Sequence, residues 1–507
     1  MTNLPYLSML ILLPLLGSLL MFVVPSALGA ARAKSVALGF SLLTFGLFVL
    51  AGLQFELGTS DEFQLVENYS WIPSFGVSWS VGIDGLGLVM LGLVSILVPV
   101  VMLAAWRDIA DAAAGKFFGL VLLLQSIVTA VFVATDLFMF YVFFEVMLIP
   151  MYFLIGRYGS EERRKAAVKF LIFSLVGGLI LLAGIISLWV NSIRISGFGS
   201  FNLEYLVNLG LDLQTQRWLF IAFFIAFAIK APLVPLHSWL PDAAGASTPA
   251  VAVLLIGILD KVGTYGMLRF LLPIFPEASV DLAPIALGLA LLSIFYGAVM
   301  AIGAKDMKRL MAYVSISHFG FIVLGIFAFT TQGISGAMFY MFSHGLSTAA
   351  LFLAAGYLMQ RTQSSKIDDH AGAFQTTPLL AGFILFGALS SVALPGLASF
   401  IAEFTVLLGT FARYPILAAV ATLGIVVAAV YALWLYQRTM TGHPSDAVTG
   451  IKDISGREVV ALSPIIALTI ALGFVPQPAF DVLNPTSAKV MQQVSQSDPA
   501  ALVEGSN

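Results

Sequence analysis

The chain reads RWLFIAFFIAFAIKAPLVPLHSWLPDA over residues 217–243, an apolar stretch of membrane length in which Lys230 is followed by Pro232 and Pro235. A proline inside a helix removes one backbone hydrogen bond and clashes with the preceding turn, so this helix must break. Freed backbone groups are tolerated within a membrane only where protein or a wet cavity surrounds them. A second break is expected at Pro395 in SSVALPGLASFIAEF, residues 390–404. Two such breaks indicate a transporter built from repeats.

The composition is that of a protein with many membrane spans. Of its 507 residues 60% are hydrophobic and only 10% are charged, against about 25% charged residues in soluble domains. The net charge of −3 and the lack of a basic tract give no sign of nucleic-acid binding. The chain has no cysteine, which excludes disulfides, thiolate–metal sites and cysteine-held iron–sulfur clusters in it. We therefore expect an all-α polytopic membrane protein without a redox centre.

About fourteen transmembrane helices are predicted, at about 20 apolar residues for each span. The N-terminal MTNLPYLSML has no positively charged region and is expected to start the first span rather than form a removable signal. The predicted spans cover residues 4–24, 34–54, 83–106, 117–134, 137–156, 166–190, 217–236, 249–271, 282–302, 309–329, 334–358, 378–411, 414–437 and 458–475.

The distribution of lysine and arginine between alternate loops predicts the orientation. One set of loops contains seventeen of these residues and the other contains five, and the two lysines inside spans complete the total of 24. The positive-inside rule assigns the richer set to the cytoplasm, which places both termini on the outer face. Residues 56–80 are then expected to form an external loop, and the polar tail after residue 475 is expected to be partly disordered.

The two predicted breaks lie five spans apart, which divides the chain into four parts. A five-helix unit repeated in tandem must insert its second copy upside down, so we expect two inverted five-helix repeats. The parts are residues 1–116 with three helices and the external loop, 117–271 with the first repeat, 282–440 with the inverted second repeat, and 441–507 with the last transmembrane helix and the tail.

Six ionisable residues lie near the middle of predicted spans. An ionised side chain there costs about 2.5–3.5 kcal/mol even on lenient scales, so such residues usually serve a proton or ion path. Their similar depth predicts a path along the membrane plane, with nearby hydroxyl groups such as that of Tyr340 providing access to the two faces. The six are Glu145, Lys230, Lys261, His318, His344 and Glu403.

Each of these residues also has a structural interpretation. A single histidine in a membrane helix is as often a hydrogen-bonded packing residue as a relay, although two histidines that titrate near neutral pH favour a relay. The glutamates and lysines could instead form structural ion pairs. His237, in the broken helix, is either a proton-uptake group or a satisfied polar residue, and Asp260 is either an auxiliary group or a partner for another helix.

Several motifs resemble one family as a set over about residues 80–440. The family is that of the antiporter-like subunits of respiratory complex I and of multisubunit cation/proton antiporters. Glu403 stands where L-type and N-type subunits have lysine, and the chain has no room for the long lateral helix of L-type subunits. The sequence thus resembles the M-type subunits of bacterial NADH:quinone oxidoreductase. The motifs are DLFMFYVFFEVMLIPMYFLIGRYG, IKAPLVPLHSWLPDA, STPAVAVLLIGILDKVGTYGMLRF, KDMKRLMAYVSISHFGFIVLG, FYMFSHGLSTAALFLAAGYL and LPGLASFIAEF.

The resemblance implies a non-redox, proton-translocating subunit in the bacterial inner membrane. It implies L-type and N-type antiporter-like subunits as neighbours, and FMN, iron–sulfur clusters and quinone on other subunits. No cofactor or metal is expected in this chain. The implied roles are a switchable ion pair for Glu145 and Lys230, the central relay for Lys261, connecting groups for His318 and His344, and the terminal acceptor for Glu403.

Two alternatives stay open on the sequence alone. A secondary cation/proton antiporter subunit would work without electron transfer and would show sodium-dependent exchange. A structural membrane spacer would lose assembly and pumping together when its ionisable residues are replaced. The leading hypothesis predicts that Lys230→Ala or Glu145→Ala abolishes proton-coupled quinone reduction while the complex still assembles.

Overall fold

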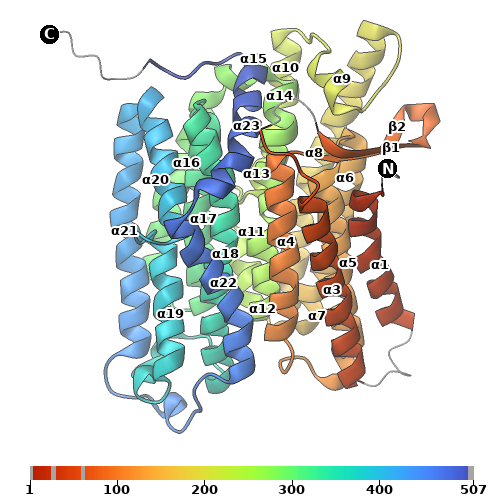
Figure 1. Ribbon diagram of the computed structural model, residues 1–507. Coiled ribbons are helices and arrows are strands. Elements are labelled where there is room, and N and C mark those ends of the chain that lie inside the picture. The colour runs from red at the N-terminus through yellow and green to blue at the C-terminus, as the bar shows by residue number, and fades with distance from the viewer. Residues whose placement is uncertain (1–3, 24–29, 59–62, 501–507) are drawn as a thin grey trace, which may run out of the picture.

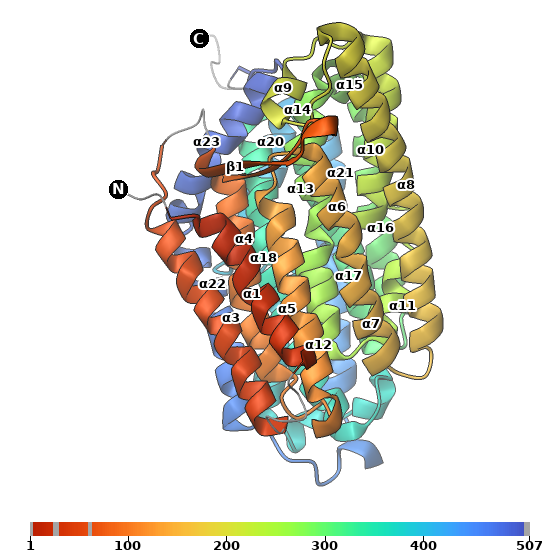
Figure 2. The ribbon, with the colours of Figure 1, turned by 90° about the vertical axis from the view of Figure 1, so that its right-hand side faces the viewer.

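The long helices stand side by side in one bundle, as the computed structural model shows in two views (Figures 1 and 2). The structure describes residues 4–23, 30–58 and 63–500. Parts of three predictions lie outside these residues: the start and end of the first span, a piece of the external loop, and the last seven residues of the tail.

The helices follow one another in chain order and fall into two halves that divide after residue 274. The first half contains α1 (Tyr6–Val23), α3 (Ala30–Gly52), α4 (Gly85–Ala104), α5 (Asp111–Val133), α6 (Leu137–Val146), α7 (Leu148–Tyr158), α8 (Arg163–Ser196), α9 (Leu203–Val207), α10 (Leu213–Lys230), α11 (Trp239–Ala246), α12 (Pro249–Ala252), a π-helical segment (Val253–Leu259), α13 (Lys261–Gly266), a second π-helical segment (Met267–Leu271) and α14 (Leu272–Ile274). The second half contains α15 (Pro276–Asp281), α16 (Ala283–Gly303), α17 (Met307–Phe327), α18 (Thr331–Thr362), α19 (Pro378–Ser391), α20 (Ala398–Arg413), α21 (Pro415–Met440), α22 (Gly456–Phe474) and α23 (Gln477–Gln493).

The membrane class predicted from composition is confirmed. Within the described residues, twelve helices or continuous helix runs are long and apolar enough to cross a membrane. The other two predicted spans are the broken ones, in which α10 is followed by an irregular segment and α19 is separated from α20. The total of fourteen spans stays a prediction.

The two broken spans run in opposite directions. In Figure 1, α10 lies in the upper part of the bundle and α11 follows below it, whereas α19 lies in the lower part and α20 continues above it. Opposite directions are what an inverted repeat requires, and the repeat itself stays a prediction. A further interruption, which sequence reasoning missed, separates α6 from α7 at Met147. Pro150 explains it, because a proline ring clashes with the carbonyl four residues earlier.

A β-hairpin forms part of the expected external loop, beside a bundle that is otherwise helical as predicted. Strand β1 (Gln64–Ile72) pairs antiparallel with β2 (Val77–Ile83). Aromatic and β-branched residues are frequent in both strands, and such residues favour a pleated, half-buried surface. Gly76 closes the turn at a φ of 71°, in the left-handed region that suits glycine. The hairpin is tied to the first helix, because Glu67 accepts hydrogen bonds from the backbone N–H groups of Leu7 and Ser8.

The segment after the last predicted span is also more ordered than expected. Residues 477–493 form α23, which corrects the prediction of a partly disordered tail for that part. Leu483, Val490 and Met491 are buried along one face at helical spacing. On the same helix, Ser487 shares a hydrogen bond with Ser335 of α18 at 2.7 Å between the two hydroxyl oxygens.

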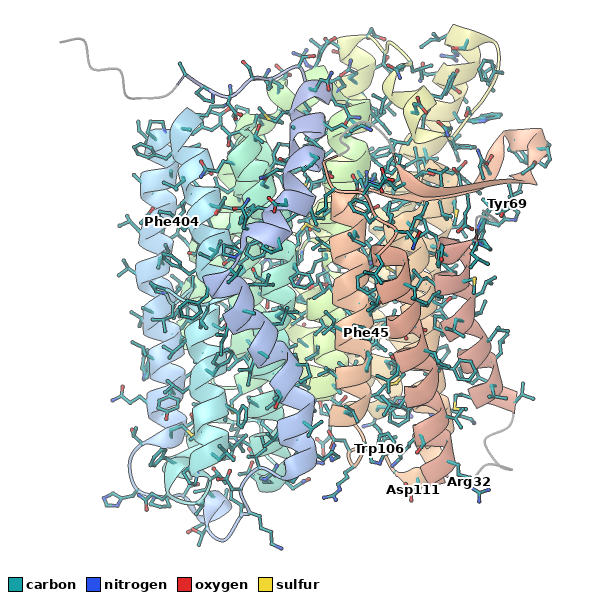
Figure 3. All side chains as sticks on the ribbon, viewed as in Figure 1. Arg32, Phe45, Tyr69, Trp106, Asp111 and Phe404 are labelled. Carbon is teal, nitrogen blue, oxygen red and sulfur yellow. The ribbon has the colours of Figure 1, made fainter. Side chains whose placement is uncertain are left out.

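The loops of the chain gather at the two ends of the bundle. The start of α1, the end of α23 and the hairpin lie at the upper end in Figure 1, and the loop between α21 and α22 lies at the lower end. Figure 3 shows Arg32 and Asp111 at the lower end with Trp106, while Tyr69 marks the hairpin and Phe45 and Phe404 lie on the sides of the bundle. Both described ends of the chain therefore lie on the same face, and its assignment as the outer face stays a prediction.

The most buried helices are those that carry the central ionisable residues. Every residue in the apolar windows of the run Pro249–Ile274 and of α18 is buried inside the bundle. Helix α17 is almost as deeply buried, whereas α3, α21 and α22 expose most of their surface. The bundle thus encloses Lys261, His318 and His344 in protein rather than presenting them to lipid.

Candidate functional site

Glu145 lies in the last turn of α6, directly before the interruption at Met147. Its carboxyl group faces α8 at Gly178, where an added Cβ would overlap the carboxylate. The glycine therefore permits the close approach of the acid to this helix. Within the described part of the chain, Oε1 of Glu145 has no hydrogen-bond partner.

Lys230 is the last residue of α10 and is buried at the break of that helix. Its Nζ donates to the hydroxyl of Ser174 on α8 at 3.3 Å and lies 5.3 Å from the ring centres of both Phe144 and Phe170. Aromatic faces attract a cation, and the attraction grows where water is excluded. The carbonyl of Ile229, in the last turn of α10, accepts a hydrogen bond from the indole N–H of Trp239 at 2.9 Å.

The predicted contact between Glu145 and Lys230 is not made directly in this structure. No ion pair within 4.0 Å joins these two described residues, although they are close enough to interact electrostatically. Ser174, which contacts the lysine, and Gly178, which faces the glutamate, lie one turn apart on α8, a rise of about 6 Å. The two groups are therefore neighbours on one face of α8 rather than a hydrogen-bonded pair.

Lys261 begins α13, directly after the first π-helical segment and Asp260. Its Nζ lies 2.6 Å from Nδ1 of His344 and donates to the carbonyl of Ile256, also at 2.6 Å. The ring of Phe319 lies 5.1 Å from the same nitrogen. The lysine is thus directed toward α18, in contact with the imidazole of His344.

Beyond His344 the polar groups continue through α17 and α18 to α20. The ring centres of His344 and His318 are 5.1 Å apart, and those of His318 and Tyr340 are 5.8 Å apart. The hydroxyl of Tyr340 donates to Oε2 of Glu403 at 3.0 Å. The structure therefore brings five residues into one buried line, here called the central line: Lys261, His344, His318, Tyr340 and Glu403.

Hydrogen bonding fixes the tautomer of His318. Its Nε2 lies 2.9 Å from the carbonyl oxygen of Ser391, and a carbonyl can only accept, so Nε2 carries a proton. This leaves Nδ1 of His318 to exchange a proton, and that atom has no partner among the described residues. Nε2 of His344 is likewise unpartnered there, so the two neighbouring rings each keep one nitrogen available.

The two auxiliary candidates, His237 and Asp260, lie in different surroundings. His237 lies in the irregular segment after α10 and packs edge-on against Tyr296 at 4.7 Å between ring centres, away from the central line. Asp260 is fully buried beside Lys261. Neither oxygen of Asp260 has a hydrogen-bond partner within the described residues.

Sequence reasoning missed three features of the site. It assigned Tyr340 to face access, yet the tyrosine links His318 to Glu403. Its spacing of four residues from His344 could have placed both on one helix face. Ser174 and Gly178 share the same spacing on α8, but nothing in their residue types pointed to Lys230 and Glu145. The two π-helical segments were not predicted, because the helical pattern of apolar residues there does not distinguish a π-helix from an α-helix.

At the upper end, a polar cavity of about 700 Å³ lies against the bundle, with Asp84, Asn202, Arg269 and Lys489 in its lining. Arg269 donates to the Asp84 carboxylate with both terminal nitrogens, which ties the start of α4 to the second π-helical segment.

Asp136, between α5 and α6, gives a prediction for stability. Burial raises its pKa from 3.8 to about 6, although three backbone N–H groups donate to it. Between about pH 4 and 6 the folded protein therefore holds a proton that the unfolded chain has released, so this group favours folding increasingly as the pH falls. We expect the stability difference between wild type and Asp136→Asn to shift by up to about 3 kcal/mol in favour of wild type from pH 7 to pH 4. Thermal unfolding in detergent measures it, and a difference independent of pH contradicts it.

Comparisons with known proteins identify the family of the chain. Residues 134–428 match the family described as NADH:quinone oxidoreductase/Mrp antiporter, TM. The chain is 44% identical to the NADH-quinone oxidoreductase subunit M of Mycobacterium tuberculosis, over 99% of this chain and 97% of that one.

Solved structures give the same result. A chain of respiratory complex I from Thermus thermophilus with bound NADH superimposes with a TM-score of 0.87 at 33% identity, covering 96% of this chain and 99% of that one. A chain of the Mrp complex from Dietzia has a TM-score of 0.86 at 23% identity, over 97% of this chain and 100% of that one, and shows the fold alone. The relative from Mycobacterium tuberculosis is a subunit M, and the chain belongs to the family of antiporter-like membrane subunits of NADH:quinone oxidoreductase.

Proposed function

We propose that this chain, an antiporter-like membrane subunit of NADH:quinone oxidoreductase, moves protons through the membrane along its buried ionisable residues. The observation that carries the proposal is the central line, in which direct contacts join a lysine, two histidines, a tyrosine and a glutamate inside the bundle. Buried ionisable groups in a membrane protein are costly, so a connected series of them indicates a conduction path.

The geometry supports a definite order of proton transfers. A protonated Lys261 gives its proton to Nδ1 of His344, which it contacts at 2.6 Å. His344 then releases the proton on Nε2 toward Nδ1 of His318, the nitrogen that the carbonyl of Ser391 leaves available. From there the proton reaches Glu403 by way of the hydroxyl of Tyr340, which already donates to the carboxylate.

Glu145 and Lys230 form the switch at the other end of the line. With the carboxylate close, the proton on Lys230 is stabilised, and with the carboxylate withdrawn the lysine releases it toward Lys261. The separated arrangement on α8 corresponds to the releasing state. We assign proton uptake to His237, which lies in the irregular segment after α10. The driving energy comes from quinone reduction elsewhere in the complex, since this chain has no cysteine to hold an iron–sulfur cluster.

The family also supports a proposal for the membrane, the orientation and the neighbouring subunits of this chain. The chain resides in the bacterial inner membrane with both termini on the outer face, and its membrane neighbours are L-type and N-type antiporter-like subunits. FMN, iron–sulfur clusters and quinone lie on other subunits. The four parts at 1–116, 117–271, 282–440 and 441–507 correspond to the leading helices, the two inverted repeats, and the last span with α23.

The proposal is tested by Glu145→Gln, which preserves the shape of the side chain and removes its charge. We expect proton-coupled quinone reduction in the assembled complex to fall about tenfold, because Lys230 loses the group that switches its proton. The measurement is proton uptake per electron in proteoliposomes, with subunit composition checked by gel. Glu67→Gln is the matched control, since its carboxyl group is buried in the hairpin far from the line.

The results of these measurements distinguish the proton-translocating subunit from the two alternative functions. Full pumping by Glu145→Gln removes the glutamate from the switch. Loss of assembly together with pumping supports a structural spacer instead. Sodium-dependent exchange in vesicles that lack the flavin and iron–sulfur subunits supports an independent cation/proton antiporter.

A further inference from the structure

A gap separates the switch from the central line. Lys230 directs its amine to Ser174 on α8, while Lys261 directs its amine to His344 on α18. The two lysines therefore turn away from each other. Among the described residues, no hydrogen bond joins the two lysines, so a proton released by Lys230 needs another group to reach Lys261.

Asp260 occupies the face of α13 that looks toward α10. Three residues further on, Gly263 packs so closely that an added Cβ would lie 2.6 Å from the backbone nitrogen of Ala231 and from the carbonyl oxygen of Phe227. Residues three apart on a helix share a face. Asp260 therefore points to the end of α10, where Lys230 lies, while Lys261 is rotated by about 100° toward α18.

The surroundings of this carboxyl group are those of a group that exchanges a proton. It is fully buried, and neither oxygen has a hydrogen-bond partner among the described residues. It interacts electrostatically with both Lys230 and Lys261. Burial of an isolated carboxylate is very unfavourable, so the group is neutral unless one of these ammonium groups compensates its charge. Its protonation is therefore linked to that of both lysines.

We infer that Asp260 carries the proton from Lys230 to Lys261, which extends the proposed function and rests on it. In the first step an N–H bond of the Lys230 ammonium breaks and an O–H bond forms on the Asp260 carboxylate, leaving a neutral amine. In the second step that O–H bond breaks and an N–H bond forms on neutral Lys261, which regenerates the carboxylate beside an ammonium group. The net result is one proton moved and no change in total charge.

The test compares Asp260→Asn with Asp260→Glu in the assembled complex in proteoliposomes. Asparagine has the shape of aspartate but cannot take up the proton, so we expect proton-coupled quinone reduction to fall about tenfold or more. Glutamate retains a carboxyl group and is expected to restore a large part of it. Asp108→Asn is the matched control, since this aspartate is hydrogen-bonded to Gln360 at the lower end, apart from the line.

An infrared difference spectrum supplies a readout that packing alone does not change. During turnover of the wild type we expect a carboxyl C=O band that is absent in Asp260→Asn. Absence of that band, or full pumping by Asp260→Asn, overturns the inference even if Asp260→Glu fails to fold. If Lys230→Ala also pumps fully, the proposed function itself fails. If Lys230→Ala is inactive while Asp260→Asn pumps, only the role of Asp260 is refuted.

Discussion

Replacing Lys261 by alanine is expected to stop proton-coupled quinone reduction, with a fall of about 10²-fold or more. The ammonium group contacts Nδ1 of His344 at 2.6 Å, so its removal leaves the two histidines without a donor. The other neighbours of the ammonium group cannot replace it as a proton donor, because neither the ring of Phe319 nor the carbonyl of Ile256 ionises. The initial rate of proton uptake in proteoliposomes, measured against assembled complex, gives the result.

Lys34→Ala is the control for that experiment. Lys34 is also a buried lysine, but it is held at the lower end of α3 by the carbonyl of Trp106 and the carboxylate of Asp111. Its replacement should disturb local stability and leave the proton pathway intact. Equal losses in the Lys34 and Lys261 variants would contradict a specific relay and favour general damage to the bundle.

Glu403→Gln is expected to have an effect of similar size at the other end of the line. Glutamine still accepts the hydrogen bond that Tyr340 now makes to Glu403 at 3.0 Å, so the packing of α18 on α20 is retained. It cannot accept a proton, and the last transfer is therefore blocked. We expect proton uptake to fall about 10²-fold while the complex assembles normally. Single-turnover proton uptake after a pulse of NADH measures the step directly.

Glu458→Gln serves as the matched variant for Glu403. Glu458 is a buried glutamate that forms a salt bridge with Arg361 at 2.7 Å, remote from the central line. Its replacement is expected to lower thermal stability and to leave pumping per assembled complex unchanged. Normal pumping by Glu403→Gln would show that protons leave the line before α20, for example at His318.

The sequence was sufficient to find the ionisable residues and the two breaks. Lys230 and Glu403 stand out because charge within an apolar span is rare, and Pro232 and Pro395 stand out because proline cannot continue a helix. Both signals are local, so they need no knowledge of which helices are neighbours. The family resemblance rested on the same local motifs, and the comparisons confirmed it.

The contacts between helices were beyond such reasoning. Whether Lys261 meets His344 or Asp260 meets Lys230 depends on how α13 is rotated between α10 and α18, and glycines such as Gly263 control that approach through backbone contacts. Tyr340 was visible only as a hydroxyl on a helix. The hairpin and α23 were missed because short strands and a weakly apolar helix give little periodic signal beside long membrane spans.

The π-helical turns over Val253–Leu259 set the direction in which Lys261 leaves the helix axis, so the backbone geometry of this segment matters as much as its side chains. A π-helical turn accommodates more residues than an α-helical one. If the same seven residues formed a regular α-helix, their turns would be tighter and Lys261 would face a different side of the helix axis. Lys261 would then leave His344 although every polar group remained in the chain. Substitutions that favour a regular α-helix over Val253–Leu259 should therefore disable the subunit as surely as the loss of the lysine.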